Sequence, residues 1–124
     1  TKIFEHKDFL KSLPIYKEYQ DIKLNTKHLV VSHGYIGKFW EDRKYLRTQA
    51  QKNRFKESII WSRDLSKIEK TIFNVFGHTP VKTPDITSFY ANIDTGVYTK
   101  QGSLTCLHFP SLKTYTQKRL DRIR

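Results

Sequence analysis

The sequence predicts a mixed α/β fold in one unit of 124 residues. Two short apolar runs, at 28–31 and 71–76, are each followed by histidine and glycine, a pattern typical of buried strands that end in sharp loops. A helix-like spacing of apolar residues over 4–12 adds the α component. In an open α/β sheet, binding groups gather on the loops beyond the carboxyl ends of the strands. These two loops are therefore the first candidates for a site.

The amino-terminal part is predicted to contain one helix and one hairpin. The helix ends near Ser12, because Pro14 interrupts the helical spacing. The turn-prone pair Asn25-Thr26 then joins the segments 19–24 and 28–31 into an antiparallel hairpin.

The middle and carboxyl-terminal parts are predicted to alternate loops with short strands. Segment 39–55 is strongly basic with a weak helical period, so we expect irregular structure with some helix. Segment 57–64 is predicted to be a short buried segment that delivers Arg63 into a loop. Segments 88–93 and 104–109 are predicted to be two further strands.

Composition indicates a folded protein that does not enter a membrane. Hydrophobic residues make up 37% and aromatic residues 14% of the chain, which excludes a disordered class. No apolar run approaches the roughly 20 residues that a membrane-spanning helix needs. Cys106 is the only cysteine, so no intramolecular disulfide forms, and we expect a cytoplasmic location.

Charge points to an anionic partner. The chain has 23 Lys and Arg against 12 Asp and Glu, a formal net charge of +11. Such an excess attracts nucleic acid or phosphorylated substrates, or forms a solvated surface. The basic tail at 113–124 is part of this excess, and we expect it to be helical.

Four short motifs stand in a fixed order along the chain. They are His33-Gly34, Trp61-Ser62-Arg63, Gly77-His78-Thr79-Pro80 and the segment Asn-Ile-Asp-Thr-Gly at 92–96. In this order they resemble the calcineurin-like metallophosphoesterases, and more closely the bacterial and phage branch of serine/threonine phosphatases and diadenosine tetraphosphatases. The resemblance spans roughly residues 9–109 and rests on the ordered set.

The resemblance implies a role for each motif. His33 and His78 would be ligands of a centre with two divalent ions, with manganese expected first and iron, zinc or nickel as alternatives. Two such ions about 3.5–4 Å apart can clamp a phosphoryl group. Arg63 would contact the substrate phosphate, because a guanidinium presents a rigid fork of donors to phosphate oxygens. Three further residues are expected to form structural turns beside the site: Gly77, Asp94 and Gly96.

The resemblance also shows what this sequence lacks. The family's Gly-Asp-x-His, Gly-Asp-x-x-Asp-Arg and Gly-Asn-His-Glu/Asp motifs, which supply most of the oxygen ligands, do not occur here. We therefore expect the second half of a β-sandwich flanked by helices (α-β-β-α). Cut through its sheet, such a half would expose an apolar strand edge and sheet face that the missing amino-terminal half or a second chain would cover.

The expected function follows from the resemblance. The complete protein would hydrolyse a phosphate ester in a phosphoprotein or in a nucleotide polyphosphate, and the chain alone would be inactive. One rival is a small basic module that binds nucleic acid, supported by the charge and by aromatic residues among basic ones. These aromatic residues are Tyr35, Phe39, Trp40 and Tyr45. A non-catalytic relative used for binding is a third possibility.

Overall fold

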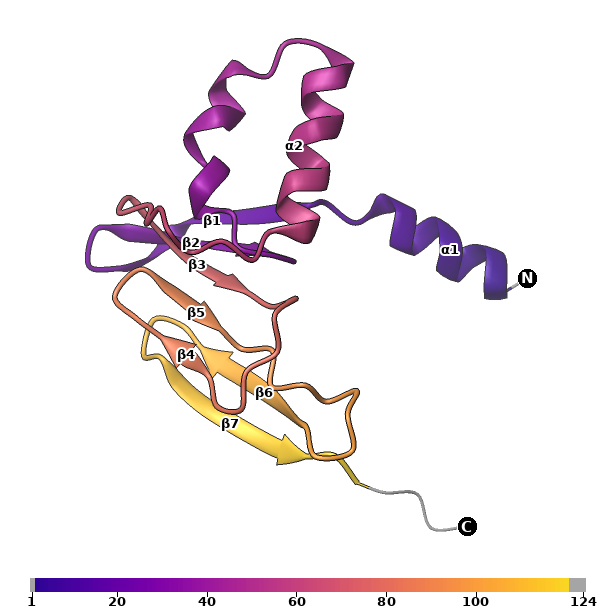
Figure 1. The fold of residues 1–124 in the computed structure, drawn as a ribbon, viewed down its shortest axis with the longest axis vertical. Coiled ribbons are helices and arrows are strands. Elements are labelled where there is room, and N and C mark those ends of the chain that lie inside the picture. Colours follow the sequence, from indigo (N-terminus) through magenta and orange to yellow (C-terminus); the bar gives the residue numbers. More distant parts are fainter. Residues whose placement is uncertain (1, 121–124) are drawn as a thin grey trace.

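The computed structural model describes residues 2–120, which form a layered α/β structure (Figure 1). A five-stranded sheet in the order β1-β2-β3-β5-β4 is accompanied by a two-stranded sheet of β6 and β7. The predicted α/β class is confirmed, and the arrangement is compatible with part of a metallophosphoesterase-type fold.

The five-stranded sheet combines a hairpin with a parallel centre. β1 (Tyr16–Leu24) and β2 (Lys27–Ser32) are antiparallel, which confirms the predicted hairpin. β3 (Ile72–Phe76) runs parallel to β2, and β5 (Tyr90–Asn92) runs parallel to β3. The short β4 (Asp85–Ile86) closes the far edge antiparallel to β5. Three neighbouring strands thus bring their carboxyl ends to one edge.

Helices occupy most of the segment for which the sequence predicted irregular structure with some helix. Two 3-10 turns, η1 (Gly37–Phe39) and η2 (Glu41–Tyr45), precede the α-helix α2 (Gln49–Trp61). The helix begins with a capping box, in which Thr48 accepts from the Gln51 backbone N–H and the Gln51 side chain accepts from the Thr48 N–H.

The prediction of a short buried segment at 57–64 is wrong. Residues 57–61 are the last turn and a half of α2, and only Ile59 among them is buried. Residues two positions apart lie on different faces of a helix, so Ile59 points to the core while Trp61 points to solvent. Arg63 does follow in a loop, as expected.

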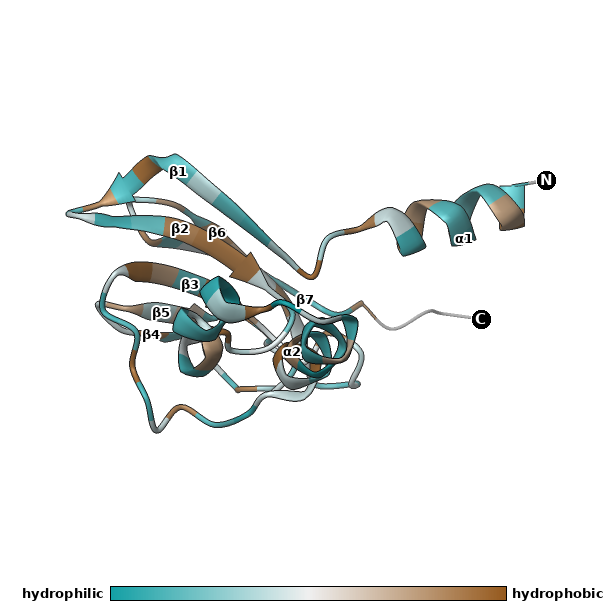
Figure 2. Ribbon diagram, turned by 90° about the horizontal axis from the view of Figure 1, so that it is seen from above, coloured by the Kyte–Doolittle hydropathy of each residue, from teal (hydrophilic) through white to brown (hydrophobic). Residues whose placement is uncertain are grey.

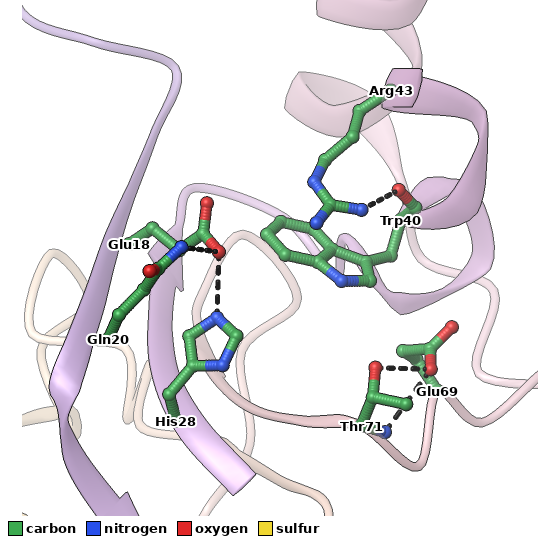
Figure 3. A network of polar contacts seen from close by, with 7 residues as sticks. All are labelled: Glu18, Gln20, His28, Trp40, Arg43, Glu69 and Thr71. Carbon is green, nitrogen blue, oxygen red and sulfur yellow. Dashed lines mark hydrogen bonds and ion pairs between the residues drawn. The ribbon is translucent and has the colours of Figure 1, made fainter. Parts of the chain in front are cut away.

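One face of the five-stranded sheet carries the main core. Trp40 is only 2% exposed and packs with buried residues from β2, the loop after β2, β3 and α2. The buried members of this cluster are Val30, Ile36, Trp40, Phe55, Ile59 and Ile72. The Arg43 guanidinium lies 3.6 Å above the Trp40 ring, and Glu18 accepts from His28 at 2.8 Å beside it (Figure 3). The edge of the core is therefore closed by charged groups that contact aromatic and polar partners.

The opposite face is covered by the hairpin of β6 (Ser103–His108) and β7 (Lys113–Lys118). Phe73 and Val75 of β3 pack there against apolar residues of this hairpin, including Leu107. The predicted helix at 113–124 is wrong over 113–118, because alternating threonine and tyrosine favour a strand that pairs with β6. The last four residues of that tail lie outside the described part of the chain.

Apolar side chains without a partner are concentrated on α1 (Lys2–Ser12), which ends where predicted. The helix stands away from the rest of the chain in both views (Figures 1 and 2), and it buries no residue. Its large apolar side chains are 63–67% exposed: Ile3, Phe4, Phe9 and Leu10. This apolar surface lies on a helix, whereas the prediction concerned a strand edge and a sheet face. Within residues 2–120, no helix combines the length and apolar character that crossing a membrane requires.

Candidate functional site

The parallel pairing of β2 and β3 brings the two predicted histidines together. His33 follows β2 and His78 follows β3 by two residues, at the same edge of the sheet. The Gly77 backbone N–H donates to the His33 carbonyl at 2.8 Å, which ties the two loops to each other. His33 Nε2 lies 3.2 Å from His78 Nδ1. The imidazoles therefore converge on one point.

His78 has a strained backbone and a perturbed imidazole. Its φ of 74° lies in the left-handed region, which costs a residue with a Cβ of order 1 kcal/mol. Burial lowers the pKa of His78, the neighbouring Arg63 and His33 lower it further, and Asp94 opposes them. Strain and a neutral imidazole are both characteristic of functional positions.

Arg63 reaches the same point from the loop after α2. Its Nε–H donates to His78 Nε2 at 3.3 Å, and no ion pair within residues 2–120 includes it. Because Nε2 accepts this bond, the neutral His78 carries its proton on Nδ1 and donates it to His33. Among the residues described, the Arg63 side chain forms this one hydrogen bond, so most of its N–H donors stay available at the site.

Asn74 holds the loop that carries His33. It is 1% exposed in the middle of β3, and its side-chain N–H₂ donates to the Val30 carbonyl at 3.1 Å and to Ser32 Oγ at 3.0 Å. Its Oδ1 accepts from the Ile36 backbone N–H at 2.9 Å. These three bonds fasten the chain on both sides of His33. Asn74 is a positioning residue that sequence reasoning missed.

Leucine has a volume similar to that of asparagine but cannot form hydrogen bonds. Replacing Asn74 by leucine therefore leaves buried backbone groups such as the Ile36 N–H without a partner, and it is expected to destabilise the chain by about 2–4 kcal/mol. Chemical denaturation measures the change. Asn53→Leu on the exposed face of α2 is the matched control, and it should cost less than about 0.5 kcal/mol. Equal effects of the two substitutions would contradict the role of Asn74.

Gly34 allows α2 to approach the His33 loop. A Cβ at this position would lie 2.4 Å from the Ile59 carbonyl oxygen and 3.0 Å from that of Ser62. Both contacts are with backbone atoms, which cannot rotate away. The glycine therefore permits the close packing that sets Arg63 beside His78.

Two of the three predicted turn residues, Asp94 and Gly96, lie on the neighbouring loop. Asp94 Oδ1 accepts from the Gly96 N–H at 3.1 Å, and Gly96 has a φ of 71°, as turn chemistry requires. A Cβ at Gly77 would lie 3.2 Å from the Asp94 Cβ. Asp94 is thus a turn residue that also lies close to the loop of His78.

A largely apolar groove opens between the two sheets beside the histidines. Its volume is about 350 Å³, and the apolar part of its lining comes from β2, β3 and β6. The lining includes Val31, Val75, Phe76 and Leu104, and both His33 and His78 contribute to it. The site therefore adjoins apolar surface that the described part of the chain leaves open.

The two imidazoles are a candidate for part of a metal centre. Two nitrogen ligands at about 2.0–2.1 Å from one ion are about 3.3 Å apart in a tetrahedral arrangement and about 2.9 Å apart in an octahedral one. The observed 3.2 Å lies between these values. Within residues 2–120, no group of three or more metal-ligating side chains occurs. His33 and His78 therefore fit two ligands of a single ion, and they do not suffice for two ions.

His28 and His108 have partners other than His33 and His78. His28 pairs with Glu18, and His108 contacts Ser111. Two of the aromatic residues that favoured nucleic-acid binding, Tyr35 and Trp40, are 1% and 2% exposed and form part of the core. Buried rings cannot stack on bases, so this support for a nucleic-acid module is removed.

No family model matches this chain. It is similar to "Bis(5'-nucleosyl)-tetraphosphatase PrpE [asymmetrical]" from Bacillus thuringiensis (strain Al Hakam), Bacillus cereus (strain AH820) and Bacillus anthracis (strain CDC 684 / NRRL 3495). Each is 32% identical over 106 residues, which cover 82% of this chain and 42% of the relative. The matched region is the carboxyl-terminal part of those proteins, and the similarity supports the metallophosphoesterase superfamily without selecting a branch.

Proposed function

We propose that this chain forms the carboxyl-terminal half of a metal-dependent phosphoester hydrolase. The convergence of His33 Nε2, His78 Nδ1 and the Arg63 guanidinium on one point carries the proposal. The similarity to tetraphosphatases favours the phosphatase class, and the chain spans 42% of their length. The amino-terminal half, or a second chain, would supply the remaining ligands.

In this proposal His33 and His78 hold one of two divalent ions, with manganese as the first choice. A divalent ion in this position would supply Lewis acidity toward a phosphoryl oxygen. The low pKa of His78 keeps its imidazole available as a ligand. If His78 held the ion through Nδ1, its proton would reside on Nε2, which could then not accept from Arg63. The Arg63 guanidinium would be free to contact the substrate phosphate.

The substrate class divides into two candidates. Nucleotide polyphosphates come first, because the similar proteins are tetraphosphatases by name. Phosphorylated serine or threonine side chains come second. Both present negatively charged non-bridging phosphate oxygens to Arg63, so the role of that residue does not depend on the choice.

Replacing Arg63 by alanine is expected to weaken phosphate binding about 10- to 100-fold, the value of charge-assisted hydrogen bonds. Calorimetric titration of the chain with inorganic triphosphate in the presence of Mn²⁺ measures the change. Arg54→Ala, which removes an equal charge from the exposed side of α2, is the control and should have little effect. Equal losses in the two variants would indicate non-specific attraction and contradict the site.

A further inference from the structure

Trp61 is a large aromatic side chain that the core does not use. It is the last residue of α2, and its side chain is 65% exposed. Its Nε1–H donates to Glu57 Oε2 at 3.1 Å, one helical turn earlier. The indole is thus held in one orientation although it lies at the surface, which lowers the entropy lost when a ligand stacks on it.

Trp61 lies beside the two residues proposed to bind metal and phosphate, His78 and Arg63. Its ring meets the His78 ring edge to face, with centroids 5.5 Å apart and planes at 81°. Arg63, two residues further along, donates to the same imidazole. An exposed aromatic surface and an uncommitted guanidinium therefore flank one point of the sheet edge.

A nucleotide carries the two groups that such a pair recognises. Its phosphate oxygens can accept paired hydrogen bonds from the Arg63 guanidinium. Its base has a flat π surface that can stack on the indole, whichever base it is. A phosphorylated serine or threonine has no such group. The exposed indole therefore distinguishes between the two substrate classes left open above.

We propose that Trp61 is a stacking surface for the base of a nucleotide whose phosphates occupy the site at His33, His78 and Arg63. This inference rests on the proposed function, and it selects nucleotide polyphosphates as the substrate class. Glu57 acts in it as a positioning residue that fixes the plane of the indole.

The test compares two probes of similar charge on the 124-residue chain with Mn²⁺: adenosine 5′-triphosphate, which has a base, and inorganic triphosphate, which has none. Calorimetry should give an affinity roughly 5- to 100-fold higher for the nucleotide, the range expected for one stacked base. Trp61→Ala should remove this preference and leave the affinity for triphosphate unchanged. Trp61→Phe should retain much of it.

Tyr45→Ala is the matched control, because Tyr45 is equally exposed at 67% but belongs to η2. It should leave the preference intact, and circular dichroism should show that each variant melts as the parent does. Equal affinity for the two probes, no binding of either, or an equal loss of both in Trp61→Ala would overturn the inference. A triphosphate affinity that is insensitive to Arg63→Ala would instead contradict the proposed function, whatever the nucleotide preference.

Discussion

The 124-residue chain alone is expected to hydrolyse an aryl phosphate no faster than a buffer that contains the same Mn²⁺. Hydrolysis by this class of site requires two ions held together, and the described residues offer two imidazole ligands and no group of three ligating side chains. A chimera that places the amino-terminal part of the Bacillus cereus tetraphosphatase before this chain should show Mn²⁺-dependent turnover.

The comparison of initial rates for the two proteins measures this effect. The amino-terminal part alone is the control, and it should also be inactive. Turnover by the short chain that persists in His78→Ala would contradict the account, because it would require a site other than the one described.

The second large effect concerns His78 in the active chimera. Loss of a residue that only supports a metal ligand typically lowers activity roughly 10- to 100-fold. Because His78→Ala would remove a ligand itself, we expect turnover to fall by more than this. Arg63→Ala should lower turnover about 100- to 1,000-fold, the usual effect of removing one hydrogen-bond donor to the charge that develops in the transition state. Mn²⁺ should stay bound in this variant.

His108→Ala is the matched control for this experiment. His108 is exposed on β6, and among the residues described its side chain hydrogen-bonds only with Ser111, so its loss should leave turnover within about twofold. Equal effects of His78→Ala and His108→Ala on turnover would place the chemistry elsewhere.

The strands that carry the histidines could be predicted because their apolar runs are continuous and end abruptly. β3 is buried at all five positions, as a central parallel strand should be. α2 was harder to predict, since its apolar residues give a weak period and only Phe55 and Ile59 are buried. Its one clear sequence signal is the capping box that begins at Thr48.

The meeting of the two histidines was predictable from the sequence, but the residues that hold them in place were not. Parallel pairing of β2 and β3 makes a meeting of His33 and His78 a consequence of topology. Asn74 gave no signal beyond a polar residue inside an apolar strand, because its three partners come from a loop and strand about 40 residues away. Trp61 follows two isoleucines and suggested burial, but the helix turns it outward.

The central claim is that His33 and His78 hold one divalent ion together. Its most direct measurement is a Mn²⁺ titration followed by nuclear magnetic resonance of the imidazole protons, which broaden near the paramagnetic ion. We expect the signals of His33 and His78 to broaden together at low Mn²⁺, those of His28 and His108 to remain sharp, and either His33→Ala or His78→Ala to abolish the effect on the partner. Broadening of all histidines alike, or of one member of the pair independently of the other, would contradict the claim.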